Sequence, residues 1–386
     1  MVVVLVAVMG AVAFLVPLSA TQLGASPALL GLIMSVSSVG SLLAAVPAGV
    51  LVDRAGTRMP LAASCVVAAI SAGGIALGDS ITSIFVFFSL FRVAEIVVFV
   101  SFQAHVAGMA EGAADTTRGF GWYGFAASLG QLLGPAAAGY LLETAGEQWS
   151  WGLSALAFLG TGALALVLVA SAPRSSARGG AAPLQGPLAM LRGGAFRRVL
   201  SGTAIVAVVA SFVIIFAGGS RGTYFPVFLT TLGYTPSVAG MLVAVGALAG
   251  LASRVLLSSL VRVLRGSFPT MLWSFAVMTV GMGLTPFCRS IPALAINSFL
   301  VGIGGGVALP LSMATVAEGA PEGMRAVAMG VRLTGNRLAA LVNPLVFGAA
   351  SALWGVPSAF VAAAIVLLGS TVGLGLWWLR RGRVAA

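Results

Sequence analysis

Long apolar runs separated by short polar breaks make up nearly the whole sequence. Breaks at charged residues and at glycine or proline clusters divide it into twelve runs. Each run is long enough to cross a bilayer as a helix, which takes ~20 apolar residues. We therefore predict an all-α membrane protein with twelve transmembrane helices. The predicted spans are 2–20, 28–52, 59–78, 83–109, 120–142, 149–171, 199–219, 236–257, 268–288, 291–316, 326–350 and 355–379.

The longest interruption, 172–198, contains proline, arginine, serine and glycine residues typical of a flexible linker. It divides the chain into two parts of six spans each, 1–171 and 199–386. Landmarks in the two parts also match at one shared offset of 209 residues, which indicates an internal repeat. We predict two pseudo-symmetric six-helix bundles joined by a cytoplasmic linker. The matched pairs are Gly31 with Gly240, Pro135 with Pro344, and Gly139 with Gly348.

Composition supports this interpretation. Hydrophobic residues make up 59% of the chain and charged residues 8%, against about 25% charged in soluble domains, so a water-soluble enzyme is excluded. The net charge of +11 does not indicate a nucleic-acid partner, because the basic residues lie in short loops instead of on one solvated face. The basic residues are all arginine, and this bias, with abundant alanine and glycine, indicates a GC-rich bacterial genome.

The arginines also predict the orientation. Most lie in the loops 53–58, 110–119, 172–198, 258–266 and 317–325 and in the tail after Leu379. The loops on the opposite side hold only Arg221 and Arg289. By the positive-inside rule, we expect a multi-pass protein of the cell (inner) membrane with both termini cytoplasmic.

The predicted turn between spans two and three carries a specific motif, Gly49-Val-Leu-Val-Asp53-Arg54-Ala-Gly56-Thr-Arg58. Gly49 allows close helix packing and Gly56 a left-handed turn. Asp53 places an anion where the positive end of a neighbouring helix can hold one conformation of a moving pair. The alternative is an ordinary charged turn.

A second motif lies in span five, Gly130-Gln-Leu-Leu-Gly134-Pro135-Ala-Ala-Ala-Gly139. Glycines four residues apart form a smooth face for close helix contact. Pro135 removes a backbone hydrogen bond and permits a bend. The alternative is generic packing of small residues in an alanine-rich chain.

Together these features resemble the major facilitator superfamily. The turn resembles the family's G-x-x-x-D-R-x-G-R-R signature, with Thr57 at a usually basic position. The span-five segment is similar to a motif of the drug-exporting, antiport branches, with Ala138 replacing a glycine. The resemblance implies that the protein works by alternating access, and we expect it to be a monomer. The resemblance also implies a central cavity lined mainly by spans 1, 4, 7 and 10, and a proton gradient, with no cofactor, as the energy source.

Span four contains the only acid that lies deep in a predicted span, Glu95, three residues after Arg92. Both lie ~14–18 Å from the end of the span at 1.5 Å per residue, near the middle of the bilayer. Arg92 resembles the arginine of the family's R-x-x-Q-G motif, which the antiport branches associate with proton movement. We assign proton coupling to Glu95 and Arg92, because burial opposes a charged carboxylate and the arginine favours it. The alternative is a static pair. Gln103 extends this face.

Span eleven supplies further candidates for the substrate cavity. Arg332, Asn336 and Asn343 share one helix face, whereas Arg337 points some 140° away. Intramembrane arginines without an acid at their depth favour an anionic or strongly hydrogen-bonding substrate. The alternative for Arg332 is snorkelling to the interface. Gln131 of span five is assigned to the same cavity.

We therefore expect a secondary active transporter, most simply one that exports a small organic compound by proton antiport. The alternative is a symporter that imports an organic anion together with protons. With His105 as its single histidine, the chain offers no catalytic or metal-binding cluster, so an enzyme is not expected. The expected partners are a small-molecule substrate and the lipid bilayer, not nucleic acid.

Overall fold

The computed structural model describes residues 1–108, 113–169, 203–319 and 325–382, and every regular element among them is helical. Twelve helical segments there are long and apolar enough to cross a membrane, which confirms the predicted fold class. The long helices are α1 (Val2–Gln22), α2 (Pro27–Ala55), α3 (Arg58–Leu77), α4 (Ile81–Gly108), α5 (Ala113–Thr144), α6 (Glu147–Leu168), α9 (Thr203–Gly219), α11 (Pro236–Val255), α13 (Ser267–Leu284), α14 (Ile291–Gly319), α15 (Arg325–Trp354) and α16 (Ser358–Gly382). Shorter elements are a π-helix η1 (Ser220–Tyr224), α10 (Phe225–Thr231), α12 (Leu257–Val263) and a 3-10 turn η2 (Thr285–Phe287).

The internal repeat is visible in how helices α2 and α11 begin. Ser26 caps α2 by accepting a hydrogen bond from the Leu29 N–H, and Pro27 is the first helical residue. Thr235 caps α11 in the same way, and there too a proline comes first. A proline at the first helical position loses no hydrogen bond and fixes φ for the helix. The two starts lie 209 residues apart, which is the offset found in the sequence.

Backbone conformations at the turns repeat with the same offset. Gly24 and Gly233 both have φ of 84°, and Gly146 and Gly355 have φ of 86° and 83°. Gly56 in the predicted turn motif has φ of 76°. Its counterpart, Arg265, is the one non-glycine residue with positive φ in the described part of the chain, at 58°. The two halves therefore share turn geometry even where the glycine has been replaced.

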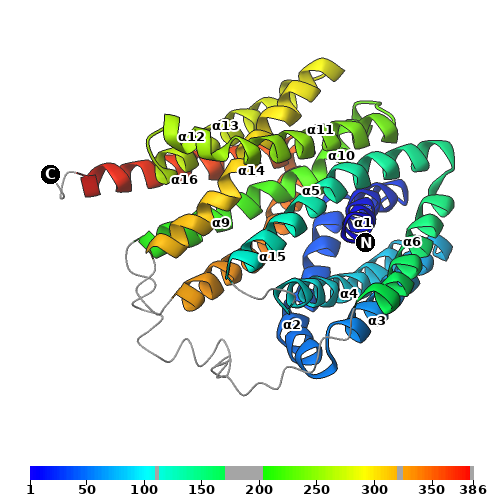
Figure 1. Ribbon diagram of the computed structural model, residues 1–386. Coiled ribbons are helices and arrows are strands. Elements are labelled where there is room, and N and C mark those ends of the chain that lie inside the picture. The colour runs from blue at the N-terminus through cyan, green and yellow to red at the C-terminus, as the bar shows by residue number, and fades with distance from the viewer. Residues whose placement is uncertain (109–112, 170–202, 320–324, 383–386) are drawn as a thin grey trace.

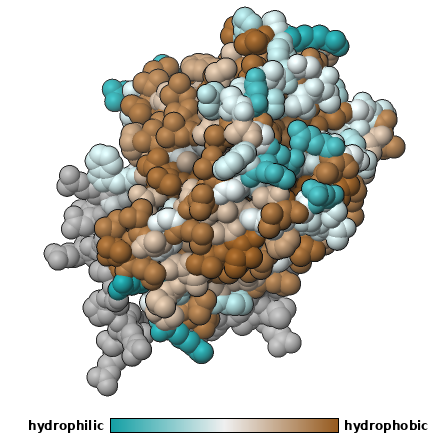
Figure 2. Space-filling model, turned by 90° about the vertical axis from the view of Figure 1, so that its right-hand side faces the viewer, coloured by the Kyte–Doolittle hydropathy of each residue, from teal (hydrophilic) through white to brown (hydrophobic). Residues whose placement is uncertain are grey.

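Helices α1 to α6 pack mainly among themselves, as do α9 to α16, and the two halves touch mainly through α2 with α15 and α5 with α11. Figure 1 shows α2, α3, α4 and α6 gathered on one side and α11, α13, α14 and α16 on the other. Apolar side chains cover most of the face in Figure 2, as a lipid-facing surface requires. The predicted linker 172–198 lies outside the described residues, so its boundaries stay a prediction.

The turns define two ends of the bundle. We call the end with the turns at 23–26, 145–146, 232–235 and 355–357 the arginine-poor end, because Arg289 is the one arginine in its described loops. The end with the turns at 55–57 and 264–266 is the arginine-rich end, since Arg54, Arg58, Arg262 and Arg265 lie there.

The seventh span differs from its prediction. The expected span was 199–219, with Arg221 in a loop beyond it, but α9, η1 and α10 run on continuously, and the apolar span covers Val208–Thr231. The segment from Ser220 to Thr223 has the low hydropathy that is typical of a loop. These residues instead form the π-helix, so Arg221 lies ten residues inside the span, ~15 Å from its end at 1.5 Å per residue.

Candidate functional site

The two halves meet through glycines at the arginine-poor end. A Cβ atom on Gly31 of α2 would lie 2.2 Å from the Pro344 carbonyl oxygen and 3.0 Å from the Gly348 Cα of α15. A Cβ atom on Gly240 of α11 would lie 2.3 Å from the Pro135 carbonyl oxygen of α5. These are the residues paired by the sequence repeat, so the repeat builds two equivalent contacts. We call them the inter-half glycine contacts.

Hydrogen bonds reinforce the same end. The Tyr224 hydroxyl lies 3.2 Å from the Pro344 carbonyl oxygen and 3.4 Å from that of Pro27, so it bridges both halves. The Ser237 N–H donates to Glu143 Oε2 at 3.1 Å. The Ser35 hydroxyl donates to the carbonyl oxygen of Leu341 at 2.7 Å. The arginine-poor end is therefore closed in this conformation.

The span-five motif serves two neighbours. Gly130 and Gly134 face α1, where added Cβ atoms would lie 2.8 Å from the Val3 carbonyl oxygen and 2.2 Å from that of Ala7. Gly139 faces the other half, where a Cβ would lie 2.2 Å from the Pro236 carbonyl oxygen. The motif thus fixes α5 within its own half and brings it into backbone contact with the other.

Toward the arginine-rich end a cavity of about 830 Å³ lies between α5 of the first half and α11 and α14 of the second. Arg254 of α11 crosses it and donates a hydrogen bond of 2.6 Å to the Ser128 hydroxyl of α5. Gly124, Leu251 and Met313 are among the other lining residues.

A second cavity of about 300 Å³ lies between the halves near mid-span. It is lined by α1, α5, η1, α10, α11 and α14, and Gln131 of α5 is among its lining residues. Spans 1, 7 and 10, three of the four expected from the family resemblance, contribute to it. The charged side chain in its lining is Arg221.

Arg221 was not among the site residues predicted from the sequence, because the hydropathy pattern placed it in a loop outside the membrane. Its Nη1 donates to Asn297 Oδ1 at 3.2 Å and its Nη2 to the Ser298 hydroxyl at 2.6 Å, both on α14. Its Cζ lies 3.6 Å from the centre of the Phe225 ring, a cation–π contact. The sequence did contain a sign that the span continues past residue 219. The expected loop, 220–235, is much longer than the other turns at this end, which take only a few residues.

The proposed coupling pair lies beside a third cavity, of about 140 Å³. Arg92 Nη1 donates to Glu95 Oε2, and both side chains are about one-quarter exposed, at 23% and 22%. Arg337 of α15 lines the same cavity from the other half. One small cavity therefore brings together a carboxylate and its paired guanidinium group from the first half and a guanidinium group from the second.

The polar face of span eleven points elsewhere, toward α9. Asn336 Oδ1 accepts a hydrogen bond from the Ser211 hydroxyl at 2.5 Å, and Asn343 Nδ2 donates to the Ile215 carbonyl oxygen at 3.3 Å. Arg332 is 1% exposed, so it does not snorkel to the interface, and its Nε and Nη2 have no hydrogen-bond partner. This face packs within the second half, whereas Arg337 faces the first, as their angular separation predicts.

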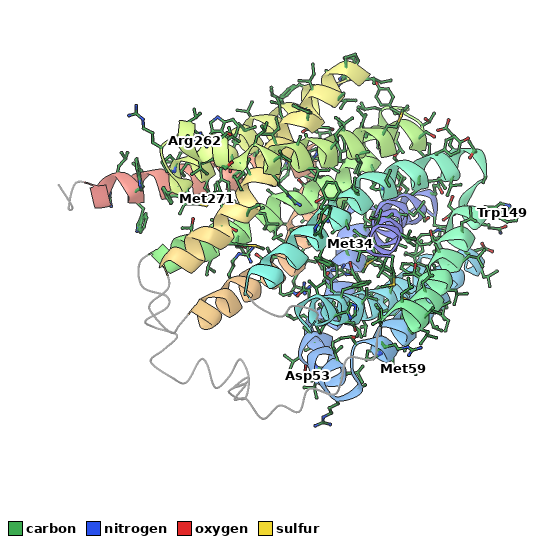
Figure 3. The ribbon with its side chains drawn as sticks, viewed as in Figure 1. Met34, Asp53, Met59, Trp149, Arg262 and Met271 are labelled. Atoms are coloured by element: carbon green, nitrogen blue, oxygen red, sulfur yellow. The ribbon has the colours of Figure 1, made fainter. Side chains whose placement is uncertain are left out.

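The remaining candidates lie apart from these cavities. Asp53 and Arg54 are exposed, and Figure 3 shows Asp53 at the α2–α3 turn with Met59. Arg58 is half-buried there. The close packing expected at Gly49 is absent, because an added Cβ would meet nothing within 4 Å. Gln103 is exposed and lines none of the three cavities.

Comparisons with known proteins agree with this architecture. Among curated proteins, an uncharacterised MFS-type transporter of Yersinia pestis is 29% identical over 307 residues, which cover 78% of this chain and 75% of the relative. The nucleoside transporter NupG, solved as a mutant, superposes with a TM-score of 0.77 at 12% identity, over 97% of this chain and 99% of its own. A bacterial homologue of the human lysosomal transporter Spinster, solved inward-facing and occupied, gives 0.75 at 13% identity, over 97% and 95%.

At these identities the solved structures establish the fold alone. The sequence profile of the Major Facilitator Superfamily matches residues 1–270 and 262–386, which together span the chain. Twelve spans, two repeated halves and a cavity between them are the architecture of that family. The chain belongs to the Major Facilitator Superfamily of membrane transporters.

Proposed function

We propose that the protein is a proton-coupled transporter that exports a small organic compound by alternating access. The observation that carries the proposal is the cavity that Glu95, paired with Arg92, shares with Arg337 of the other half. A protonatable group in a cavity lined by both halves can link proton binding to their relative movement. The proton gradient then supplies the energy, and no cofactor is needed.

The charges suggest how the link works. With Glu95 ionised, the three side chains carry a net charge of +1, and the carboxylate attracts an arginine from each half. Protonation of Glu95 leaves two facing guanidinium groups with no anion between them. Like charges in a poorly solvated site repel strongly, so protonation favours separation of α4 from α15. Loss of the proton favours their approach.

The two ends of the bundle support the alternating-access part of the proposal. The inter-half glycine contacts close the arginine-poor end, while the cavity of about 830 Å³ lies toward the arginine-rich end. If the positive-inside rule holds, the arginine-rich end faces the cytoplasm in the cell (inner) membrane. A compound would then enter from the cytoplasm in this state and leave after the glycine contacts part.

Export is favoured by the span-five motif, which resembles that of antiporters and here forms one of the inter-half glycine contacts. The second candidate, import of an organic anion with protons, is favoured by the charge between the halves. Arg92, Arg221, Arg254 and Arg337 line the three cavities with Glu95 as the acid among them. Both candidates share the coupling residue and differ in the direction of transport.

The test uses purified full-length protein in proteoliposomes, with a cargo chosen from organic acids, amines and neutral solutes by thermal stabilisation. Glu95→Gln keeps the shape but cannot release a proton, so we expect it to abolish accumulation driven by a pH gradient while counterflow exchange continues. Asp79→Asn, an exposed acid in the α3–α4 loop, is the matched control. Gradient-driven accumulation that survives in Glu95→Gln refutes the coupling proposal. Accumulation of the cargo against the direction of proton flow indicates export by antiport, and accumulation in the same direction as proton flow indicates import by symport.

A further inference from the structure

We propose that Arg221 is the anion-binding residue of the cavity near mid-span, and that it recognises the carboxylate of a small organic acid with an apolar body. The proposal deepens the proposed function, on which it rests, by naming the class of cargo. It begins from the π-helix. Elements of this kind interrupt α-helices frequently at functional sites. Here the interruption places Arg221 and Gly222 in the cavity wall.

The guanidinium group has donors to spare. Of its five N–H donors, two are used, by Asn297 and Ser298. Both acceptors are neutral, and no carboxylate among the described residues forms an ion pair with Arg221. An unpaired charge within a membrane-spanning segment is expensive, and such groups as a rule face a cavity, a counter-ion or a substrate. The remaining donors are suited to a carboxylate, which a guanidinium group can bind through two parallel hydrogen bonds.

The contacts of Arg221 also fix its direction. The Arg221 Cζ lies over the ring of Phe225, one turn later on the same span, 3.6 Å from the ring centre. Asn297 is itself held, since its Nδ2 donates to the Gly281 carbonyl oxygen at 2.6 Å and its Oδ1 accepts from the Thr285 hydroxyl at 3.1 Å. A site that is positioned before the ligand arrives loses less entropy on binding. These supports are what a specific binding residue needs.

The rest of the lining describes the body of the ligand. Apart from Arg221, Gln131 and Ser298, the wall consists of apolar side chains and glycines, among them Phe14 and Val243. Its volume of about 300 Å³ is at the small end of ligand pockets, which span roughly 300–1,000 Å³. The cavity therefore fits a compact monocarboxylate, such as an aromatic acid, better than a sugar or a peptide.

A purely structural role for Arg221 would be to join span 7 to α14 through Asn297 and Ser298. A neutral donor could form such bonds without placing a charge in the membrane, so this role does not account for an arginine. The two roles predict different ligand selectivity. A structural arginine gives no preference for a charged ligand over its neutral analogue.

The experiment uses the full-length protein in lipid nanodiscs with three matched probes: phenylacetate, its neutral amide phenylacetamide, and the cation phenethylamine. Binding is measured by thermal stabilisation and calorimetry. We expect wild type to bind phenylacetate at least about tenfold more tightly than the other two, and Arg221→Gln to lose that preference. Arg221→Lys, which keeps the charge but not the planar fork, should retain part of it. Arg289→Gln removes an exposed arginine at the arginine-poor end and is the control.

Equal binding of the acid and the amide by wild type overturns the proposal, as does failure to bind phenylacetate at all. This comparison needs no variant, so it holds even if Arg221→Gln does not fold. Counterflow of phenylacetate separates this inference from the proposed function. Acid-selective binding that depends on Arg221, without any transport, would refute the transport proposal and leave the site standing. Transport with no preference for the acid would refute the binding role of Arg221 and leave the transport proposal standing.

Discussion

Gly31→Ala tests whether the inter-half glycine contacts hold the arginine-poor end closed. The substitution adds one methyl group on α2, where it meets the Pro344 carbonyl oxygen at 2.2 Å, the Gly348 Cα at 3.0 Å and the Tyr224 hydroxyl at 3.0 Å. Two of these atoms are backbone, so they cannot turn aside as the end of a flexible side chain can. The helices themselves must separate.

The size of the effect follows from these distances. Ordinary contact begins at 3.4 Å, so α2 and α15 must move apart by about 1.2 Å at this point. Overpacking of this kind destabilises the packed arrangement by about 1–3 kcal/mol. The alanine is accommodated once the halves have parted, so most of the penalty falls on the closed state. We therefore expect the equilibrium to shift toward the state open at this end by roughly 5- to 150-fold.

The measurement is the distance between spin labels on the two halves at the arginine-poor end, in nanodiscs, where orientation does not matter. Gln148→Cys on α6 and Phe287→Cys on η2 are both exposed there. The native Cys65 and Cys288 are replaced by alanine. The parent protein should give one dominant distance, and Gly31→Ala should add a longer one. By the repeat, Gly240→Ala should do the same, since its methyl group meets the Pro135 carbonyl oxygen at 2.3 Å.

Gly73→Ala on α3 is the control, because a Cβ there meets nothing within 4 Å. It should leave the distance distribution unchanged and stabilise its helix slightly, by up to about 1 kcal/mol. An unchanged distribution in both Gly31→Ala and Gly240→Ala would show that these contacts do not set the equilibrium. The account of the closed end would then be wrong, even if the protein still transports.

Two further predictions concern the arginines of α15. Arg337→Ala should weaken the affinity for an anionic cargo, seen as a higher KM for phenylacetate counterflow, because a positive charge between the halves is lost; an unchanged KM would argue against any role in anion binding. Arg332→Met should raise the midpoint of thermal unfolding, because it removes a buried guanidinium group with two unsatisfied nitrogens and such replacements stabilise by about 1–4 kcal/mol; a lower midpoint would show that Arg332 has a favourable partner.

The sequence predicts those features that depend on local patterns. The spans follow from hydropathy, and the i,i+3 spacing of Arg92 and Glu95 is enough to predict their pairing. The different directions of Asn336 and Arg337 follow from helical periodicity. The offset of 209 residues locates the glycines and prolines that form the inter-half glycine contacts. It does not reveal that Gly31 touches Pro344 and not Gly240, its counterpart in the repeat.

What the sequence misses depends on contacts between the halves or on an unusual helix. The cavity that Arg337 shares with Glu95 joins residues from different bundles, and no local pattern encodes it. Arg221 was misplaced because a π-helix that contains serine, arginine, glycine and threonine has the hydropathy of a loop. The apolar residues that follow, Phe225 to Leu229, continue the span and were the available clue. A long expected loop beside short ones should prompt a search for such a continuation.

The arginines between the two halves affect the energetics of export and import differently. Moving one elementary charge across the membrane is worth about 2.3 kcal/mol per 100 mV. Export of a monoanion in exchange for one proton carries the equivalent of two positive charges inward, so the membrane potential contributes about 4.6 kcal/mol per 100 mV in addition to the pH gradient. Import of the same anion with one proton moves no net charge and draws on the pH gradient alone. Selection of anions by the cavities between the halves therefore strengthens the driving force for export. The arginines that line these cavities were taken above to favour import, but they suit an exporter equally well.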